Sequence, residues 1–188
     1  DDYNVLWTGT NTIVGHLDWT GGTMYGPGTT LILPSSSLNI SGNDQKRIEA
    51  GRILSNAGTV TWTGLGDLFN NPAATINNSG LFDIRNNQGI QTGAGPLAIN
   101  NTGTFRKSAG TGANVVYASF NNSGTIETLS GVLLFSGGLN LSPASVLRFP
   151  IGGRTPASQF GRVTTSGALR LNGALEASLS NGFLPGAS

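Results

Sequence analysis

Apolar residues recur along the chain at a fixed long interval and, within each interval, at every second position. Four segments of seven residues show the recurrence most directly, because each places a glycine between two apolar positions. The glycines of these four segments are Gly58, Gly80, Gly103 and Gly124. They are separated by 22, 23 and 21 residues. Self-similarity at such a period is typical of a repeat architecture.

Extending the interval in both directions gives eight registers, at positions 15, 36, 58, 80, 103, 124, 145 and 167. Two residues after each register stands an apolar residue: Leu17, Leu38, Val60, Phe82, Phe105, Ile126, Leu147 and Leu169. The next residue is always polar, and we call this column the polar strip: Asp18, Asn39, Thr61, Asp83, Arg106, Glu127, Arg148 and Arg170. A third column, four residues before the registers, is apolar: Ile32, Leu54, Ile76, Ile99, Phe120, Leu141 and Val163. Alternation at every second residue indicates strands.

The pattern predicts an all-β chain that folds as one parallel β-helix domain over residues 1–188, with about eight turns of 21–23 residues. Each turn would contain two regular strands joined by a corner of Asn, Ser and Gly. One turn cannot bury its apolar face alone, so neighbouring turns must stack, and right-handed winding is the default. The third side, which contains Met24, Phe69 and Val115, shows no fixed offset, and we expect functional loops there.

The corners predict their own stabilising contacts. Asn56, Asn78, Asn101 and Asn122 share one column and should form a ladder of side-chain amides. The glycine two residues later suggests a positive φ. Pro34 and Pro143 fall in the same column in the flanking turns, so the ladder should stop there.

A further column, four residues after the registers, is expected to point inward. Trp19 and Trp62 belong to it, so the sequence predicts that both indoles are buried. Lys107 and Thr128 interrupt this apolar column. The 23-residue step at Gly103 then suggests a local bulge.

Composition narrows the classes of function. The formal net charge is +1 and only 10% of residues are charged, which argues against a nucleic-acid-binding protein. The absence of cysteine excludes disulfides and thiolate metal sites. Neither a membrane-spanning apolar stretch nor a signal peptide is visible. The first and last residues resemble cuts through a longer polypeptide, so we expect a piece of a larger secreted protein.

The segments FNNSGTIETLSG (120–131) and TFRKS (104–108) resemble repeats of large secreted and surface bacterial proteins, the autotransporter-like and adhesin-like β-helices. The segments RVTTSGAL (162–169), NGAL (172–175) and NGFLP (181–185) resemble the last turns of such passengers. The resemblance implies an extracellular or cell-surface location. It is specific for architecture only, because similar β-helices serve as adhesins, stalks, polysaccharide-degrading enzymes and carbohydrate-binding modules.

Few residues are placed for catalysis. His16 lies close to Asp18 and forms with it a possible base and orienting acid, but a solvated surface pair is the simpler interpretation. Asp83 and Glu127 stand two turns apart, near the upper limit for a glycosidase carboxyl pair. Arg106 lies between them, which favours a charge ladder instead. We therefore predict no catalytic residues, no metal and no cofactor.

Polysaccharide is the ligand that the sequence favours. Trp7 and Tyr25 lie outside the regular strands and could stack on sugar rings. Members of the polar strip could hydrogen-bond an extended polysaccharide, neutral or acidic; those that we select are Asp18, Asp83, Arg106, Glu127 and Arg148. The leading hypothesis is a non-catalytic, extracellular polysaccharide-binding module. The alternatives are a structural or adhesive passenger segment and, third, a polysaccharide-degrading enzyme.

The remaining partner predictions follow from the shape of a β-helix. Its two ends expose unpaired strand edges, so the chain should carry caps or associate end to end. Other expected partners are neighbouring domains of a longer chain. Nucleic acid and membrane insertion are not expected.

Overall fold

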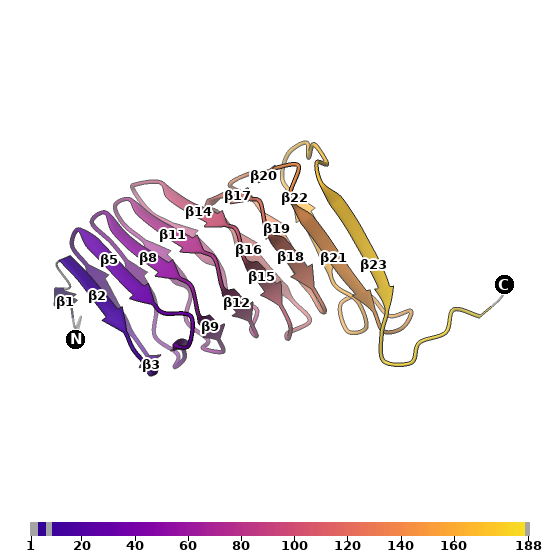
Figure 1. Ribbon diagram of the computed structural model, residues 1–188, viewed down its shortest axis with the longest axis horizontal. Helices are drawn as coiled ribbons and strands as arrows, with labels where there is room; N and C mark the ends of the chain where they lie inside the picture. Colours follow the sequence, from indigo (N-terminus) through magenta and orange to yellow (C-terminus); the bar gives the residue numbers. More distant parts are fainter. Residues whose placement is uncertain (1–3, 7–8, 187–188) are drawn as a thin grey trace.

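The computed structural model describes residues 4–6 and 9–186 and contains three parallel β-sheets, with no helix in the described part of the chain. The chain winds through the three sheets in turn, and successive coils lie side by side from the N-terminal to the C-terminal end (Figure 1). This confirms the predicted parallel β-helix.

Each sheet takes one strand from successive coils. Sheet A contains β1 (Asn4–Leu6), β4 (Gly22–Tyr25), β7 (Lys46–Ile48), β10 (Leu68–Asn70), β13 (Ile90–Thr92), β16 (Ala113–Val116), β19 (Val132–Phe135) and β22 (Arg162–Thr165). Sheet B contains β2 (Gly9–Ile13), β5 (Gly28–Ile32), β8 (Arg52–Asn56), β11 (Ala74–Asn78), β14 (Leu97–Asn101), β17 (Ser119–Asn122) and β20 (Leu139–Leu141). Sheet C contains β3 (His16–Trp19), β6 (Ser37–Ile40), β9 (Thr59–Trp62), β12 (Leu81–Ile84), β15 (Thr104–Lys107), β18 (Thr125–Thr128), β21 (Val146–Ile151) and β23 (Ala174–Leu179).

The prediction of two regular strands and one irregular side in each turn is wrong, because the third side forms a regular parallel sheet, sheet A. Gly22 pairs with Lys46, Ile90 with Val116, and Phe135 with Thr165, all in parallel. The number of residues between paired positions therefore changes from coil to coil, which hid this sheet in the sequence. The corners absorb the difference in length, and the strands stay in register.

Sheet C has the register that the repeat predicts over most of its length. Leu38 pairs with Val60, Val60 with Phe82, and Phe82 with Phe105. The last predicted register is wrong, because Leu147 pairs with Leu175 and not with Leu169. The insertion of 152–161 between β21 and β22 breaks the interval there. The count of eight turns was also too high, since β22 and β23 have no strand of sheet B between them.

Sheet B departs from the prediction at both ends. Leu54, Ile76, Ile99 and Phe120 pair as expected, but Thr30 and Leu139 occupy the next places in their column. Ile32 and Leu141 lie beside Asn56 and Asn122 instead, and Val163 belongs to sheet A. The turns at 33–36 and 142–145 shift the register of the preceding strand by two residues. A shift of two preserves the inward or outward direction of each side chain.

The predicted amide ladder forms, and we call Asn56, Asn78, Asn101 and Asn122 the inner asparagine ladder. The Nδ2 of Asn56, Asn78 and Asn101 donates to the Oδ1 of the next member at 2.6, 2.7 and 2.7 Å. All four side chains are buried. The ladder ends at the predicted coils, but the residues that stand beside its last members are Ile32 and Leu141, and not Pro34 and Pro143.

The corner glycines are required for a reason other than the predicted one. Gly58, Gly80, Gly103 and Gly124 are not among the residues with positive φ. A Cβ on Gly80 would overlap the carbonyl oxygen of Gly58, and one on Gly103 would overlap that of Gly80. Glycine is therefore needed because consecutive corners approach each other closely.

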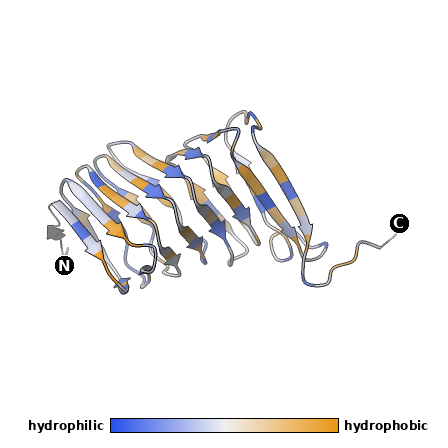
Figure 2. Cartoon of the chain, viewed as in Figure 1, coloured by the Kyte–Doolittle hydropathy of each residue, from blue (hydrophilic) through white to orange (hydrophobic). Residues whose placement is uncertain are grey.

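The interior is a continuous apolar stack. Phe82, Phe105, Phe120 and Phe135 form a row with ring centroids 4.8–5.2 Å apart. The individual strands carry both hydrophobic and hydrophilic segments (Figure 2), as alternation between the core and the solvent requires. Trp62 is 0% and Trp19 is 7% exposed, so the prediction that both indoles are buried is confirmed.

Lys107 does not mark the predicted bulge. β15 pairs with β12 residue for residue, and the extra residue of the 23-residue step lies in the corner 93–96, before β14. The Lys107 side chain is buried, and its Nζ donates to Asn86 O at 2.7 Å and Asn114 Oδ1 at 2.6 Å. Burial lowers the pKa of Lys107 to about 8.

The ladder predicts that replacing either of two neighbouring asparagines has very different effects on the free energy of unfolding. Asn101→Ala removes one of the three acceptors of the buried Asn78 amide and leaves the buried oxygen of Asn122 without its donor, so the free energy of unfolding should fall by about 3 kcal/mol. Asn100→Ala, the matched control, changes a half-exposed side chain and should cost less than about 1 kcal/mol. Urea denaturation of both variants measures the difference. Equal losses would contradict the structural role of the ladder.

Candidate functional site

Three outward surfaces carry the candidate functional residues, one on each sheet. They are the polar strip of sheet C, a row of asparagines on sheet B, and an aromatic face on sheet A. The outcome for the polar strip is mixed, because its register is as predicted except at the end. Glu176, and not Arg170, pairs with Arg148.

The polar strip contains alternating acids and bases that neutralise one another. Arg106 binds Asp83 with two hydrogen bonds of 3.0 Å and lies 3.9 Å from Glu127. Arg148 lies 3.9 Å from Glu127 and 2.8 Å from Glu176. The arrangement is the charge ladder that the sequence favoured. It leaves little uncompensated charge for an acidic polysaccharide.

Asp83 was predicted to be an exposed ligand residue, and this is wrong, because its side chain is 0% exposed. Arg85 donates to its carboxylate at 2.7 Å from one side, and Arg106 binds it from the next coil. Burial would raise the pKa of Asp83, but hydrogen bonds from Arg106, Ser108 and Arg85 outweigh it and hold the pKa below the ordinary 3.8. An ionised, enclosed carboxylate of this kind is not a general acid for glycoside cleavage.

His16 and Asp18 form the exposed pair that the sequence suggested. His16 Nε2 lies 3.3 Å from Asp18, and His16 Nδ1 lies 2.8 Å from the hydroxyl of Ser37. Asn39 donates to Asp18 at 2.7 Å, and this hydrogen bond is the main reason for the lowered pKa of Asp18. The backbone N–H of Ser37 is bonded to Gly15, so it cannot stabilise an oxyanion. The group therefore fits a solvated surface cluster.

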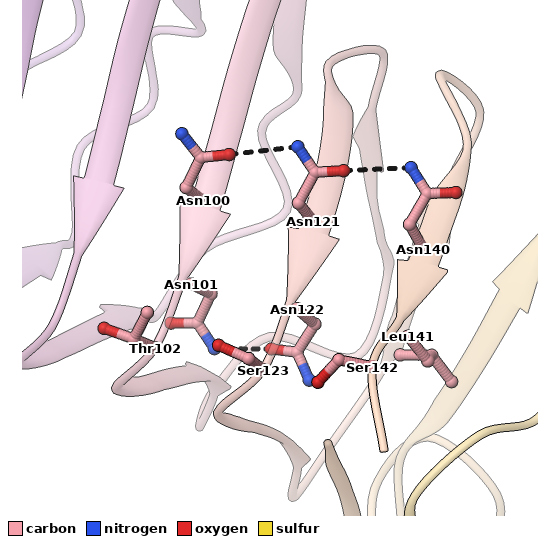
Figure 3. Close-up of a pocket in the computed structure, with 9 residues that line it drawn as sticks. All are labelled: Asn100, Asn101, Thr102, Asn121, Asn122, Ser123, Asn140, Leu141 and Ser142. Carbon is pink, nitrogen blue, oxygen red and sulfur yellow. Dashed lines mark hydrogen bonds between the residues drawn. The ribbon is translucent and has the colours of Figure 1, made fainter. Parts of the chain in front are cut away.

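Sheet B presents a second column of asparagines, one residue before the inner ladder, which the sequence analysis missed. We call Asn77, Asn100, Asn121 and Asn140 the outer asparagine row. Their amides are joined by hydrogen bonds of 2.9, 3.0 and 2.9 Å, and Figure 3 shows the last three members side by side. The last three members line a shallow hollow of about 330 Å³, together with Thr102, Ser123 and Ser142. The repeated Asn-Asn-Ser/Thr triplets were the available signal.

Sheet A presents aromatic side chains on alternate strands, which we call the aromatic face. Tyr25 on β4 is 41% exposed, and Tyr117, directly after β16, is 46% exposed. Phe69 lies between them on β10, and the Arg47 guanidinium lies 5.2 Å from the centroid of its ring. Gln91 on β13 completes the series, with its amide bonded to Asp67 at 3.1 Å. Aromatic and planar polar groups thus alternate from strand to strand.

The structure places the predicted ligand-binding residues on two different sheets. Tyr25 lies on sheet A, whereas Asp18, Arg106, Glu127 and Arg148 lie on sheet C. Trp7 lies outside the described residues, so its prediction is untested. Among the described residues, no cluster of three or more His, Cys, Asp or Glu side chains could hold a metal ion. The same part of the chain has no helix that is long and apolar enough to cross a membrane.

Asp83→Asn tests the charge ladder through its pH dependence. Because the folded chain favours the carboxylate, its stabilisation is present above the unfolded pKa of about 4 and is lost as the pH falls through the lower folded pKa. We expect Asp83→Asn to lower the free energy of unfolding by about 2 kcal/mol at pH 7, with the deficit shrinking toward pH 3. Denaturant titrations across this range measure it, with the exposed Asp18→Asn as control. A deficit independent of pH would contradict the ladder.

Comparison of the chain with protein-family models, with curated proteins and with solved structures gives no match. The function is therefore argued from the chemistry of the three surfaces. Two of them are largely self-satisfied, because the polar strip pairs its charges and the outer asparagine row pairs its amides. The aromatic face is the surface whose large side chains remain exposed.

Proposed function

We propose that the chain is a non-catalytic, extracellular polysaccharide-binding module that uses the aromatic face of sheet A. The observation that carries the proposal is the alternation of aromatic and planar polar side chains across sheet A: Tyr25, Arg47, Phe69 and Gln91 on four successive strands and Tyr117 directly after the fifth. Sugar rings have an apolar face of C–H groups and a rim of hydroxyls. Exposed tyrosines pack against the C–H face, and guanidinium and amide groups form hydrogen bonds with the hydroxyls.

The dimensions suit an extended ligand that crosses the strands. Neighbouring parallel strands are about 4.8 Å apart, so Tyr25 and Tyr117, four strands apart, are separated by roughly 19 Å along the coil axis. Tyr25 lies one residue beyond the paired Met24 and Ile48, whereas Arg47 and Phe69 pair directly. The backbone N–H of Tyr117 bonds Ile90, which places Tyr117 beside Gln91. A polysaccharide of several units could contact both tyrosines at once.

The face is also held rigid, which lowers the cost of binding. Phe69 is half-buried and packs beneath the Arg47 guanidinium. Arg47 is further fixed by Gln45 at 2.8 Å and Glu49 at 3.4 Å. Side chains that are ordered before the ligand arrives lose little conformational entropy on binding.

Glycan binding by tyrosine variants tests the proposal. We expect the chain to bind at least one polysaccharide from a panel of plant and bacterial glycans in affinity electrophoresis or calorimetry. Tyr25→Ala and Tyr117→Ala should each weaken that binding about tenfold, or about 1.4 kcal/mol, and the double variant should weaken it further. The size of the effect reflects the loss of one stacked ring.

Leu65→Ala is the matched control, because Leu65 is 63% exposed and lies outside the aromatic face. It should bind like the original chain. Arg148→Ala checks the polar strip and should also leave affinity unchanged. If no glycan binds, or if both tyrosine variants bind normally, the proposal fails. Release of reducing ends or unsaturated products from a polysaccharide would instead favour the third hypothesis, a polysaccharide-degrading enzyme.

The second candidate, a structural or adhesive segment, is favoured by the last strand. Within the described part of the chain, β23 pairs only with β21, and Leu171, Leu175 and Leu179 are 66%, 64% and 54% exposed. Such apolar surface beside a free strand edge fits a neighbouring domain or a second chain. A chain of this kind would associate through β23 and bind none of the glycans.

A further inference from the structure

Five asparagines in the sequence begin an Asn-x-Ser/Thr motif, the acceptor motif for N-linked sugars. They are Asn39, Asn77, Asn100, Asn121 and Asn140. The last four are the outer asparagine row of sheet B. One column of one sheet thus contains four of the five motifs, and every member of the row begins one.

The outer asparagine row faces solvent and keeps donors free. Asn121 and Asn140 are exposed, and Asn77 and Asn100 are half-exposed. An asparagine amide has two N–H groups. Asn121 and Asn140 each donate one of them to the preceding member of the row, at 3.0 and 2.9 Å. The other N–H of both side chains has no acceptor among the described residues.

The inner asparagine ladder is the built-in contrast, because its members stand next to the row in the sequence but point inward. Asn78 is 1% exposed, and its Nδ2 donates to Asn101, Thr104 and Gly80 at 2.7, 3.0 and 3.3 Å. Both of its N–H groups are therefore used. Asn101 has three equivalent acceptors. Adjacent asparagines in one segment thus differ completely in what a transferase could reach.

We propose that the outer asparagine row is a modification site that accepts N-linked sugars. The donor is a sugar activated as a nucleoside or lipid diphosphate. Nδ2 forms a bond to the anomeric carbon, the bond from that carbon to the diphosphate breaks, and one amide proton is released. The remaining N–H still reaches the Oδ1 of the preceding member, so the row of hydrogen bonds survives the reaction.

Spacing along the row limits how many sites carry a sugar at once. Consecutive members lie on neighbouring strands, about 4.8 Å apart, which is narrower than two sugar rings side by side with their hydration. Alternate members are about twice as far apart. The folded chain should therefore accept at most two sugars on the row, on two members that are not neighbours: Asn77 and Asn121, Asn100 and Asn140, or Asn77 and Asn140.

The test uses a soluble glycosyltransferase that moves one hexose from a UDP-hexose to Asn-x-Ser/Thr motifs. The folded chain is incubated with it, and intact mass and peptide mass spectrometry locate the hexoses. We expect one or two hexoses on the row and none on Asn78, Asn101 or Asn122. Ser123→Ala removes the motif of Asn121 and keeps its amide, so this variant should lose the hexose at Asn121 only.

The urea-unfolded chain is the control for motif recognition, since there all five motifs are equally accessible. Modification of the unfolded but not the folded chain would overturn the proposal, as would a preference for Asn39 over the row. Modification of neither form would overturn it as well. The inference does not depend on the polysaccharide-binding proposal, because the modified row lies on sheet B and the tyrosines lie on sheet A.

Discussion

The coils depend on one another for their backbone hydrogen bonds, because each strand in residues 4–6 and 9–186 pairs with strands of the preceding or following coils. Parallel pairing fixes the distance between coils but tolerates a shift along the strand. The inner asparagine ladder limits that freedom, since each Nδ2 must meet the Oδ1 of the next coil. The corner glycines act with it, because they allow consecutive turns to approach closely.

Polar groups elsewhere in the interior serve the same purpose by other chemistry. Lys46, Arg52 and Lys107 are fully buried near corners. Lys46 donates to the carbonyls of Gly42 and Asp44, and Lys107 donates to those of Asn86 and Ala109. Lys46 and Lys107 thus bind main-chain oxygens of corners, and Arg52 binds the carbonyl oxygen of Gly9 and the hydroxyl of Thr30. Asp83 is the acidic counterpart on sheet C, where two arginines enclose it.

The sequence predicted the parts of this fold where the repeat interval is constant. Leu38, Val60 and Phe82 stack as the interval requires, because 22 residues separate each of them from the next. Sheet A was not found, since its corners differ in length and no fixed offset relates Ile90 to Val116. Leu169 was misplaced for the same reason, after the insertion of 152–161.

Candidate site residues were harder to predict than the fold, because outward columns look alike in sequence. Tyr25 was found as an exposed aromatic, whereas Asp83 was placed on the surface although two arginines bury it. The register of a column says which way a side chain points, but not whether long neighbours cover it. The outer asparagine row was overlooked because the same triplets already explained the inner ladder.

The most direct test of this account is NMR detection of couplings across the hydrogen bonds of the inner asparagine ladder. Asn101 Nδ2 should couple to the side-chain carbonyl carbon of Asn122, whose oxygen lies 2.7 Å away. Asn78 Nδ2 should couple in the same way to Asn101. Couplings between other pairs of side chains, or rapid solvent exchange of these amides in the folded chain, would contradict the stacking that we describe.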